Sequence, residues 1–142
     1  MSGPTTPDRG LIDTSVAIAL GPAEVTLLPG EMAISTLTLA ELVRGPVLAP
    51  DAVARVRRRE LAQAVEAVLE ALPFDSTSAR AFGHVCAAVS TAGRKPGGTR
   101  TVDLMIAATA LAHGFALYTL NAADLRGLED LIEIVDLDQV SG

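Results

Sequence analysis

The chain has 142 residues, of which 49% are hydrophobic and 3% aromatic, with a formal net charge of −6 and one cysteine. This length and apolar content suit one domain with a packed core and exclude an intrinsically disordered chain. One cysteine excludes an internal disulfide, and the scarcity of aromatic residues argues against nucleic-acid binding by base stacking on a sheet.

The first half of the chain alternates short apolar runs with helical segments. Residues 1–9, within the polar segment MSGPTTPDRG, predict a flexible leader, and residues 10–142 predict one domain. Since no charged and then apolar leader opens the chain, we expect a cytoplasmic protein. The predicted elements are a strand at 10–13, a helix at 14–20 capped by Asp-Thr-Ser and stopped by Gly21-Pro22, a strand at 32–35, and a helix from 36 that ends at Gly45.

The second half continues the alternation with longer helices. A helix is expected from 51 to 72, ended by Pro73, and its core-facing stripe would be Val53, Val56, Leu61, Val65, Val68, Leu69 and Leu72. The remaining predicted elements are a strand starting at Phe74, a helix at 76–90, a loop at 92–100, a helix at 101–113 stopped by Gly114, a strand at 115–120 and a last strand at 131–137.

The uncharged run at 104–123 is twenty residues long, which is the length of a membrane-spanning helix. His113, Gly114 and Asn121 interrupt it, so we expect a helix, a turn and a strand, and no membrane association. Strands that alternate with helices favour a parallel sheet covered on both faces. The expected fold class is therefore α/β, with a three-layer α/β/α arrangement and a mostly parallel sheet of about five strands.

Four acids interrupt apolar elements: Asp13, Glu41, Asp103 and Asp124. Asp13 and Asp124 follow the first and fourth predicted strands, and ligands of open α/β sheets bind at the carboxyl ends of the strands. If these two strands are neighbours, all four carboxylates converge on one crevice. Ser15 and Asn121 would add neutral oxygens to it.

Converging carboxylates require a compensating charge. At ~4 Å two like charges repel by about 1 kcal/mol in water and about 4 kcal/mol at an effective dielectric near 20. Oxygen ligands suit Mg²⁺, for which Mn²⁺ can substitute, whereas His84, His113 and Cys86 do not have the spacing of zinc ligands. Such an ion lowers the pKa of a bound water and orients it, so the pattern predicts metal-assisted cleavage of a phosphodiester by water.

The segments LIDTSVAIAL, TLAELVRG, TVDLMIAATALAHG and TLNAADL resemble, in order and spacing, the four acidic motifs of PIN domains, specifically the VapC-type toxins of bacterial toxin–antitoxin pairs. The resemblance extends from Leu11 to about Val135. It differs where Leu125 follows Asp124, because an aromatic residue is frequent after that acid, and this difference touches packing more than chemistry.

The resemblance implies a PIN-like fold and a magnesium-dependent endoribonuclease that cuts structured RNA such as tRNA or rRNA. The metal ligands would be Asp13, Asp103 and Asp124, and Glu41 would hold a second ion or activate water. Ser15 and Asn121 would orient these groups. The implied protein partners are an antitoxin that blocks the crevice and a second copy of the chain in a homodimer.

Basic residues form two groups despite the negative total. We expect Arg94, Lys95 and Arg100, which flank a glycine turn, to contact RNA phosphates, whereas the arginines at 55–59 fit a solvated helix face better. Two other functions stay open. A haloacid-dehalogenase-like phosphatase would require an Asp two places after Asp13, where Ser15 stands, and a non-catalytic module that binds RNA or a partner would not need all four acids.

Overall fold

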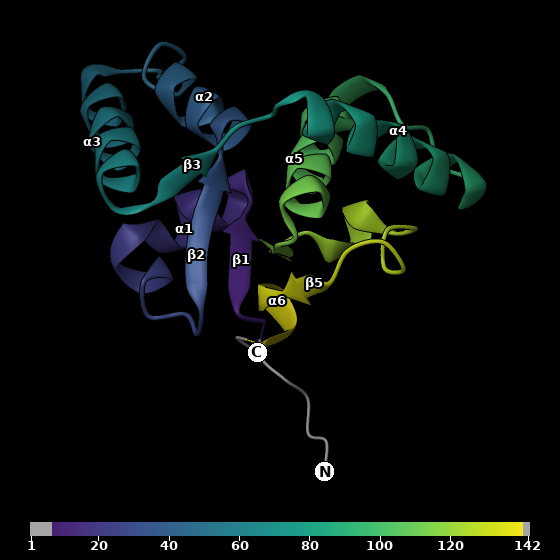
Figure 1. Cartoon of the computed structure of the whole chain (residues 1–142). Helices are drawn as coiled ribbons and strands as arrows, with labels where there is room; N and C mark the ends of the chain where they lie inside the picture. The colour runs from purple at the N-terminus through teal and green to yellow at the C-terminus, as the bar shows by residue number, and fades with distance from the viewer. Residues whose placement is uncertain (1–6, 141–142) are drawn as a thin grey trace.

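The computed structural model describes residues 7–140, in which a five-stranded parallel sheet lies between two layers of helices (Figure 1). The strand order is β3-β2-β1-β4-β5, and every neighbouring pair is parallel. This confirms the expected fold class, and the first and fourth strands are neighbours, which is the condition under which the strand-end acids converge. The strands are β1 (Arg9–Ile12), β2 (Glu31–Ser35), β3 (Glu70–Leu72), β4 (Ala116–Thr119) and β5 (Ile134–Asp136).

Helices cover both faces of the sheet because each central strand sends successive apolar side chains to opposite faces. Leu11 packs in the core with α4 and α5, whereas its neighbour Ile12 packs in a second core with α1 and α3. The helices are α1 (Thr14–Val25), α2 (Thr36–Arg44), α3 (Ala52–Val68), α4 (Ser76–Thr91), α5 (Thr101–His113) and α6 (Leu137–Val140), with short 3₁₀ turns η1 (Gly98–Arg100) and η2 (Ala122–Leu125).

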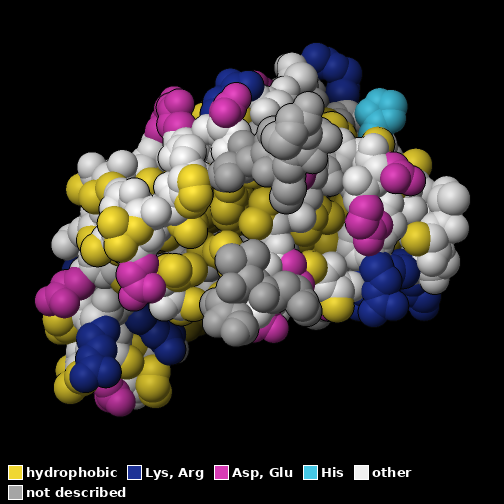
Figure 2. Space-filling view, turned by 90° about the horizontal axis from the view of Figure 1, so that it is seen from below, with side chains coloured by type: hydrophobic (Ala, Val, Ile, Leu, Met, Phe, Trp, Pro, Cys, Tyr) yellow, Lys and Arg dark blue, Asp and Glu magenta, His cyan; other side chains and the backbone are white. Residues whose placement is uncertain are grey.

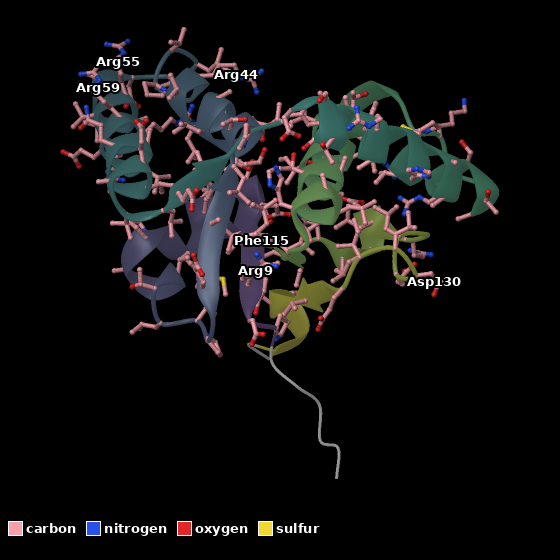
Figure 3. The ribbon with its side chains drawn as sticks, in the orientation of Figure 1. Arg9, Arg44, Arg55, Arg59, Phe115 and Asp130 are labelled. Atoms are coloured by element: carbon pink, nitrogen blue, oxygen red, sulfur yellow. The ribbon has the colours of Figure 1, made fainter. Side chains whose placement is uncertain are left out.

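The side chains of Tyr118 and Met32 pack directly against Gly10 of β1. This residue is buried and pairs with Ala116 in β4. A Cβ added to it would lie 2.4 Å from Cε1 of Tyr118 and 2.9 Å from Sδ of Met32, so the Tyr118 ring occupies the space that a side chain would need. At the same edge of the sheet, Arg9 lies over the Phe115 ring, 4.9 Å from its centroid (Figure 3).

Two predictions about the α3 region are wrong. The helix ends at Val68, because Leu69 is extended with φ −112° and ψ 135°, and residues 70–72 form β3 beside β2. No strand starts at Phe74, which lies in the connection to α4. Pairing with Ala33, Ile34 and Ser35 satisfies the backbone of this short edge strand and overrides the helical propensity of its sequence.

The predicted core stripe of α3 is also only partly correct. Val65 and Leu69 are buried, but Val53, Val56 and Val68 are exposed to solvent. The end of α1 differs as well, since the chain kinks at Gly21 with φ 71° and resumes a helical turn from Pro22 to Val25. Proline is favoured at the first position of a helical turn, so Gly21-Pro22 restarts the helix here.

The long uncharged run at 104–123 forms most of α5, then a turn at Gly114, and then β4, as predicted. None of the helices between residues 7 and 140 combines the length and the apolar character needed to cross a membrane. Figure 2 views the molecule from below, toward the amino ends of β1 and β2, where hydrophobic side chains gather across the middle of the face.

Candidate active site

The candidate site is a small crevice at the carboxyl ends of β1 and β4. From β1 the chain proceeds outward through β2 and β3, and it then returns to place β4 on the other side of β1. This reversal of strand order is the position at which ligands bind in open α/β sheets. The crevice is lined by Asp13, Ser15, Asp103, Leu117, Thr119, Asn121, Asp124 and Leu125.

Asp13 stands where β1 gives way to α1 and caps that helix. Its backbone N–H donates to the carbonyl of Tyr118 at 3.0 Å, so the last link between β1 and β4 lies at the acid itself. One carboxylate oxygen, Oδ1, accepts from the backbone N–H of Val16 at 3.1 Å and from the hydroxyl of Ser15 at 2.6 Å. Two donors on one oxygen fix the carboxylate and stabilise the start of α1.

Ser15 also joins the two strand ends, because its Oγ accepts from the backbone N–H of Leu120 at 3.3 Å. On the β4 side, the hydroxyl of Thr119 accepts from the backbone N–H of Asn121 at 2.9 Å. The carbonyl of Asn121 accepts from the backbone N–H of Asp124 at 3.0 Å, which turns the chain into η2. These bonds bring Asp124 into the crevice that Asp13 also lines.

Asp103 lies in the first turn of α5 and faces the other acids. Burial raises the pKa of its carboxyl group, and the charges of Glu41, Asp13 and Asp124 raise this pKa further, while Arg100 opposes them. The Asp103 residue is exposed to solvent, so water still reaches its carboxyl group. The three neighbouring negative charges therefore contribute more to the raised pKa than burial does. The four acids are therefore electrostatically coupled.

Glu41 occupies a different position from the three aspartates. It lines a neighbouring apolar hollow with Ile18, Leu42, Gly45, Arg58 and Leu61, and it does not line the aspartate crevice. Its Oε1 accepts a hydrogen bond from the hydroxyl of Thr14, the residue after Asp13. Glu41 thus borders the crevice from the side of α2.

The three predicted RNA-contact residues lie near the crevice but outside it. The guanidinium of Arg94 donates to the carbonyl of Ala123 at 2.7 Å, which ties this arginine to the turn that carries Asp124. Arg94, Lys95 and Arg100 line a separate open hollow with the glycines of the loop before α5. Arg100 is close enough to Asp103 for its charge to act on that carboxyl group.

The donor set fits a hard divalent cation in its chemistry. Asp13, Asp103, Asp124, Ser15 and Asn121 offer only oxygen ligands apart from one amide nitrogen, and the mutual repulsion of the carboxylates is relieved by a positive charge. In the part of the chain that is described, no three acids, histidines or cysteines are already grouped as a metal cage.

Residues 11–131 match the family model of the PIN domain. This match includes the carboxyl end of β1, the whole of β4, all four acids and every residue that lines the crevice. The chain belongs to the PIN-domain family. The resemblance read from the four acidic motifs is therefore confirmed.

This PIN domain is similar to ribonucleases of the VapC group. It is 34% identical over 118 residues to Ribonuclease VapC5 of Mycobacterium tuberculosis, covering 81% of this chain and 84% of that protein. It is 28% identical over 125 residues to Ribonuclease VapC1 of Rickettsia felis, covering 85% and 91%. Its fold matches the crystal structure of VapBC-5, a toxin–antitoxin system of M. tuberculosis, with a TM-score of 0.76, 31% identity, and coverage of 92% and 99%.

Two hydroxyl residues of the site, Thr14 and Thr119, have no distinctive signal in the sequence. Thr119 lines the crevice with a fully buried side chain, and Thr14 contacts Glu41. A threonine at the end of an apolar strand and one at the start of a helix are both common, so only their position beside the acids indicates a role.

Proposed function

We propose that this PIN domain is a magnesium-dependent endoribonuclease and the toxin of a toxin–antitoxin pair, which cleaves structured RNA such as tRNA or rRNA in the cytoplasm. The observation that carries the proposal is the convergence of three aspartates on one crevice, where burial and the neighbouring carboxylates raise the pKa of Asp103. Clusters of titratable groups with perturbed pKa values are typical of functional sites. The similarity to VapC ribonucleases gives the reaction class.

In the proposed mechanism, Asp13, Asp103 and Asp124 hold Mg²⁺ or Mn²⁺. When bound, the ion lowers the pKa of a water molecule and stabilises charge on the phosphate and the leaving oxygen. Ser15 keeps the Asp13 carboxylate oriented through its 2.6 Å hydrogen bond. Glu41 would accept a proton from the attacking water at a carboxylate oxygen while the water oxygen forms a bond to phosphorus. The bond from phosphorus to the leaving oxygen then breaks, and the leaving oxygen takes a proton from solvent.

RNA would reach the crevice across positively charged side chains. Lys95 and Arg100 lie in the open hollow beside the crevice, and we assign them contacts to phosphates on that side. Arg94 would contribute through the turn of Asp124, to which it is already bonded. These contacts position the backbone of the RNA and carry no sequence readout.

The test is an RNA cleavage assay with purified protein. Cleavage is expected with Mg²⁺ and none with EDTA, and Asp13→Asn and Asp103→Asn should each lower the rate by more than about 100-fold. Asp130→Asn is the matched control, because Asp130 is exposed in a loop away from the crevice (Figure 3). Cleavage that survives both EDTA and the two crevice substitutions would contradict the proposal.

The antitoxin is the second part of the proposal, and the hollow between α1, α2 and α3 is its suggested docking surface. Ile18, Val43, Val47, Leu48, Val53 and Val56 expose large apolar side chains on or near these helices. Apolar patches of this kind are typical of protein interfaces. Arg44, Arg55 and Arg59 extend from the adjoining ends of α2 and α3 (Figure 3), which favours a partner segment with both apolar and acidic residues.

Because Glu41 and Ile18 line the same hollow, a segment seated there would also approach the catalytic acids. Ile18→Glu should weaken binding of the proposed antitoxin by more than about tenfold, measured by calorimetry. Leu27→Glu is the control, since Leu27 is 82% exposed in the loop after α1. Equal binding of both variants would contradict this surface, and light scattering would test the homodimer.

A further inference from the structure

A small group of hydroxyls connects the start of α1 to Glu41 on α2. The Oγ1 atom of Thr14 lies 2.5 Å from Oε1 of Glu41 and 3.2 Å from Oγ1 of Thr38. Thr38 precedes Glu41 by three residues, so both side chains lie on the same face of α2. Asp13 alone caps α1, which leaves the Thr14 hydroxyl available for these contacts.

The chemistry of the three groups fixes the direction of their hydrogen bonds. A hydroxyl has one proton, and a carboxylate only accepts, so the Thr14 proton is directed to Glu41. The Thr38 hydroxyl then donates to Thr14. Thr38 is fully buried, and a buried hydroxyl requires a partner, which Thr14 provides.

The contact between Thr14 and Glu41 matters because Glu41 is the acid that does not line the crevice. Asp13 is fixed by two donors, whereas Glu41 has the longer side chain and stands in an apolar hollow with room for other rotamers. A hydroxyl bonded to the Glu41 carboxylate restricts this side chain when the protein folds. The entropy of ordering it is then not lost during the reaction. Since Thr14 directly follows Asp13, the same bond ties Glu41 to the position of the aspartate crevice.

We propose that Thr14 is a positioning residue, whose hydroxyl holds the Glu41 carboxylate beside the aspartate crevice for proton transfer. The buried Thr38 hydroxyl finds its own partner in Thr14 and takes no part in the proposed positioning. The inference rests on the proposed nuclease function, because it assigns Thr14 a role only through Glu41. It adds a neutral residue to a reaction otherwise attributed to acids.

The first test compares substitutions that keep or remove the hydroxyl. Thr14→Val retains the shape of the side chain and should lower kcat for RNA cleavage by about 10–100-fold with KM within about twofold. Thr14→Ser retains the hydroxyl and should stay within about threefold of the parent. A Thr14→Val enzyme with the parent's kcat would overturn the inference.

Thr14→Val also leaves the buried Thr38 hydroxyl without a partner, so the variant can lose stability for a reason unrelated to catalysis. The double variant Thr14→Val with Thr38→Val removes both hydroxyls and should regain thermal stability while kcat stays low. Thr38→Val alone leaves the bond from Thr14 to Glu41 intact and should keep most of the activity. Recovery of kcat in the double variant would mean that Thr14 acts through stability only.

A double-mutant cycle with Glu41→Gln separates action through Glu41 from action elsewhere. If Thr14 acts through Glu41, Thr14→Val has no further effect on kcat in the Glu41→Gln background. Thermal melting of the same four proteins without metal gives a readout that is independent of activity. The melting shifts of the two single variants should fail to sum to that of the double variant, and additive shifts would overturn the contact.

The outcomes distinguish this inference from the function on which it rests. An inactive parent in Mg²⁺ contradicts the nuclease assignment and the role of Thr14 with it. A parent that cleaves RNA and loses activity on Asp13→Asn, but keeps it on Thr14→Val, leaves the nuclease assignment intact and rejects the role of Thr14 alone.

Discussion

The packing of the Tyr118 ring of β4 over β1, the two strands at whose ends the crevice lies, depends on the missing side chain of Gly10. Substituting Gly10 by Ala would put a methyl group 2.4 Å from Cε1 and 2.7 Å from Cδ1 of Tyr118. Carbon atoms that are not bonded pack at about 3.5–4.0 Å, so the ring would have to retreat by about 1 Å. Tyr118 is 3% exposed and held among other core residues, so this movement spreads into the second core.

We expect Gly10→Ala to cost about 1–3 kcal/mol of unfolding free energy, the usual range for overpacking a well-filled core. For a chain of this length that corresponds to a melting temperature lower by roughly 3–10 °C. The backbone at Gly10 has no positive φ, so conformational strain adds nothing and the loss comes from the contact alone. Urea unfolding followed by circular dichroism measures the difference.

Substitutions at Tyr118 decide whether the ring causes the loss. Tyr118→Leu removes the aromatic carbon at the closest contact, so Gly10→Ala should be less harmful in that background than in the parent. Tyr118→Phe keeps the ring and serves as the matched control, in which the full loss should persist. An unchanged cost in the Leu background, or a Gly10→Ala protein as stable as the parent, would refute the reasoning.

Two further predictions concern pH, and their signs are opposite. The pKa of Asp103 is raised in the folded state, so metal-free protein should lose stability as pH rises above the ordinary value of 3.8. Asp103→Asn should abolish this loss of unfolding free energy, measured by urea titration in EDTA at several pH values. The same substitution should also abolish the stabilisation that Mg²⁺ gives the parent protein. Hydrogen bonds from Ser78 and the charge of His113 lower the pKa of Asp75 in the folded protein. The stability that Asp75 contributes is therefore lost as pH falls below 3.8. Asp75→Asn should make the free energy of unfolding depend less on pH in this acidic range.

The parts of the fold that could be predicted from sequence are those in which local signals agree with tertiary packing. The strand after Glu31 and the helix stopped by Gly114 have both apolar patterning and clear end signals. Asp13 could be identified because a charged group directly after an apolar strand is costly without a partner, and Asp124 because it lies in the short turn that follows another apolar strand. Their meeting then followed from β1 and β4 being neighbours, which the sheet confirms.

The end of α3 could not be predicted for the opposite reason. The sequence from Val65 to Leu72 consists of Val, Glu, Ala and Leu, has no glycine or proline, and favours a continuous helix. The strand forms only because β2 presents an open edge there, and nothing local in the sequence reports that edge. The exposure of Val53 and Val56 escaped prediction likewise, since apolar side chains that face a partner have the same spacing as those that face a core.

The same asymmetry explains which site residues the sequence reveals. A carboxylate in an apolar setting violates a rule of burial, so each acid is conspicuous in the sequence. Ser15 is indicated in the sequence only by its place two residues after Asp13. The Thr14 hydroxyl that contacts Glu41 gives no such signal, because threonine is ordinary at helix starts. The charged residues of a site can therefore be identified from the sequence more easily than the hydroxyls that hydrogen-bond to them. The contacts of those hydroxyls become visible only in the structure.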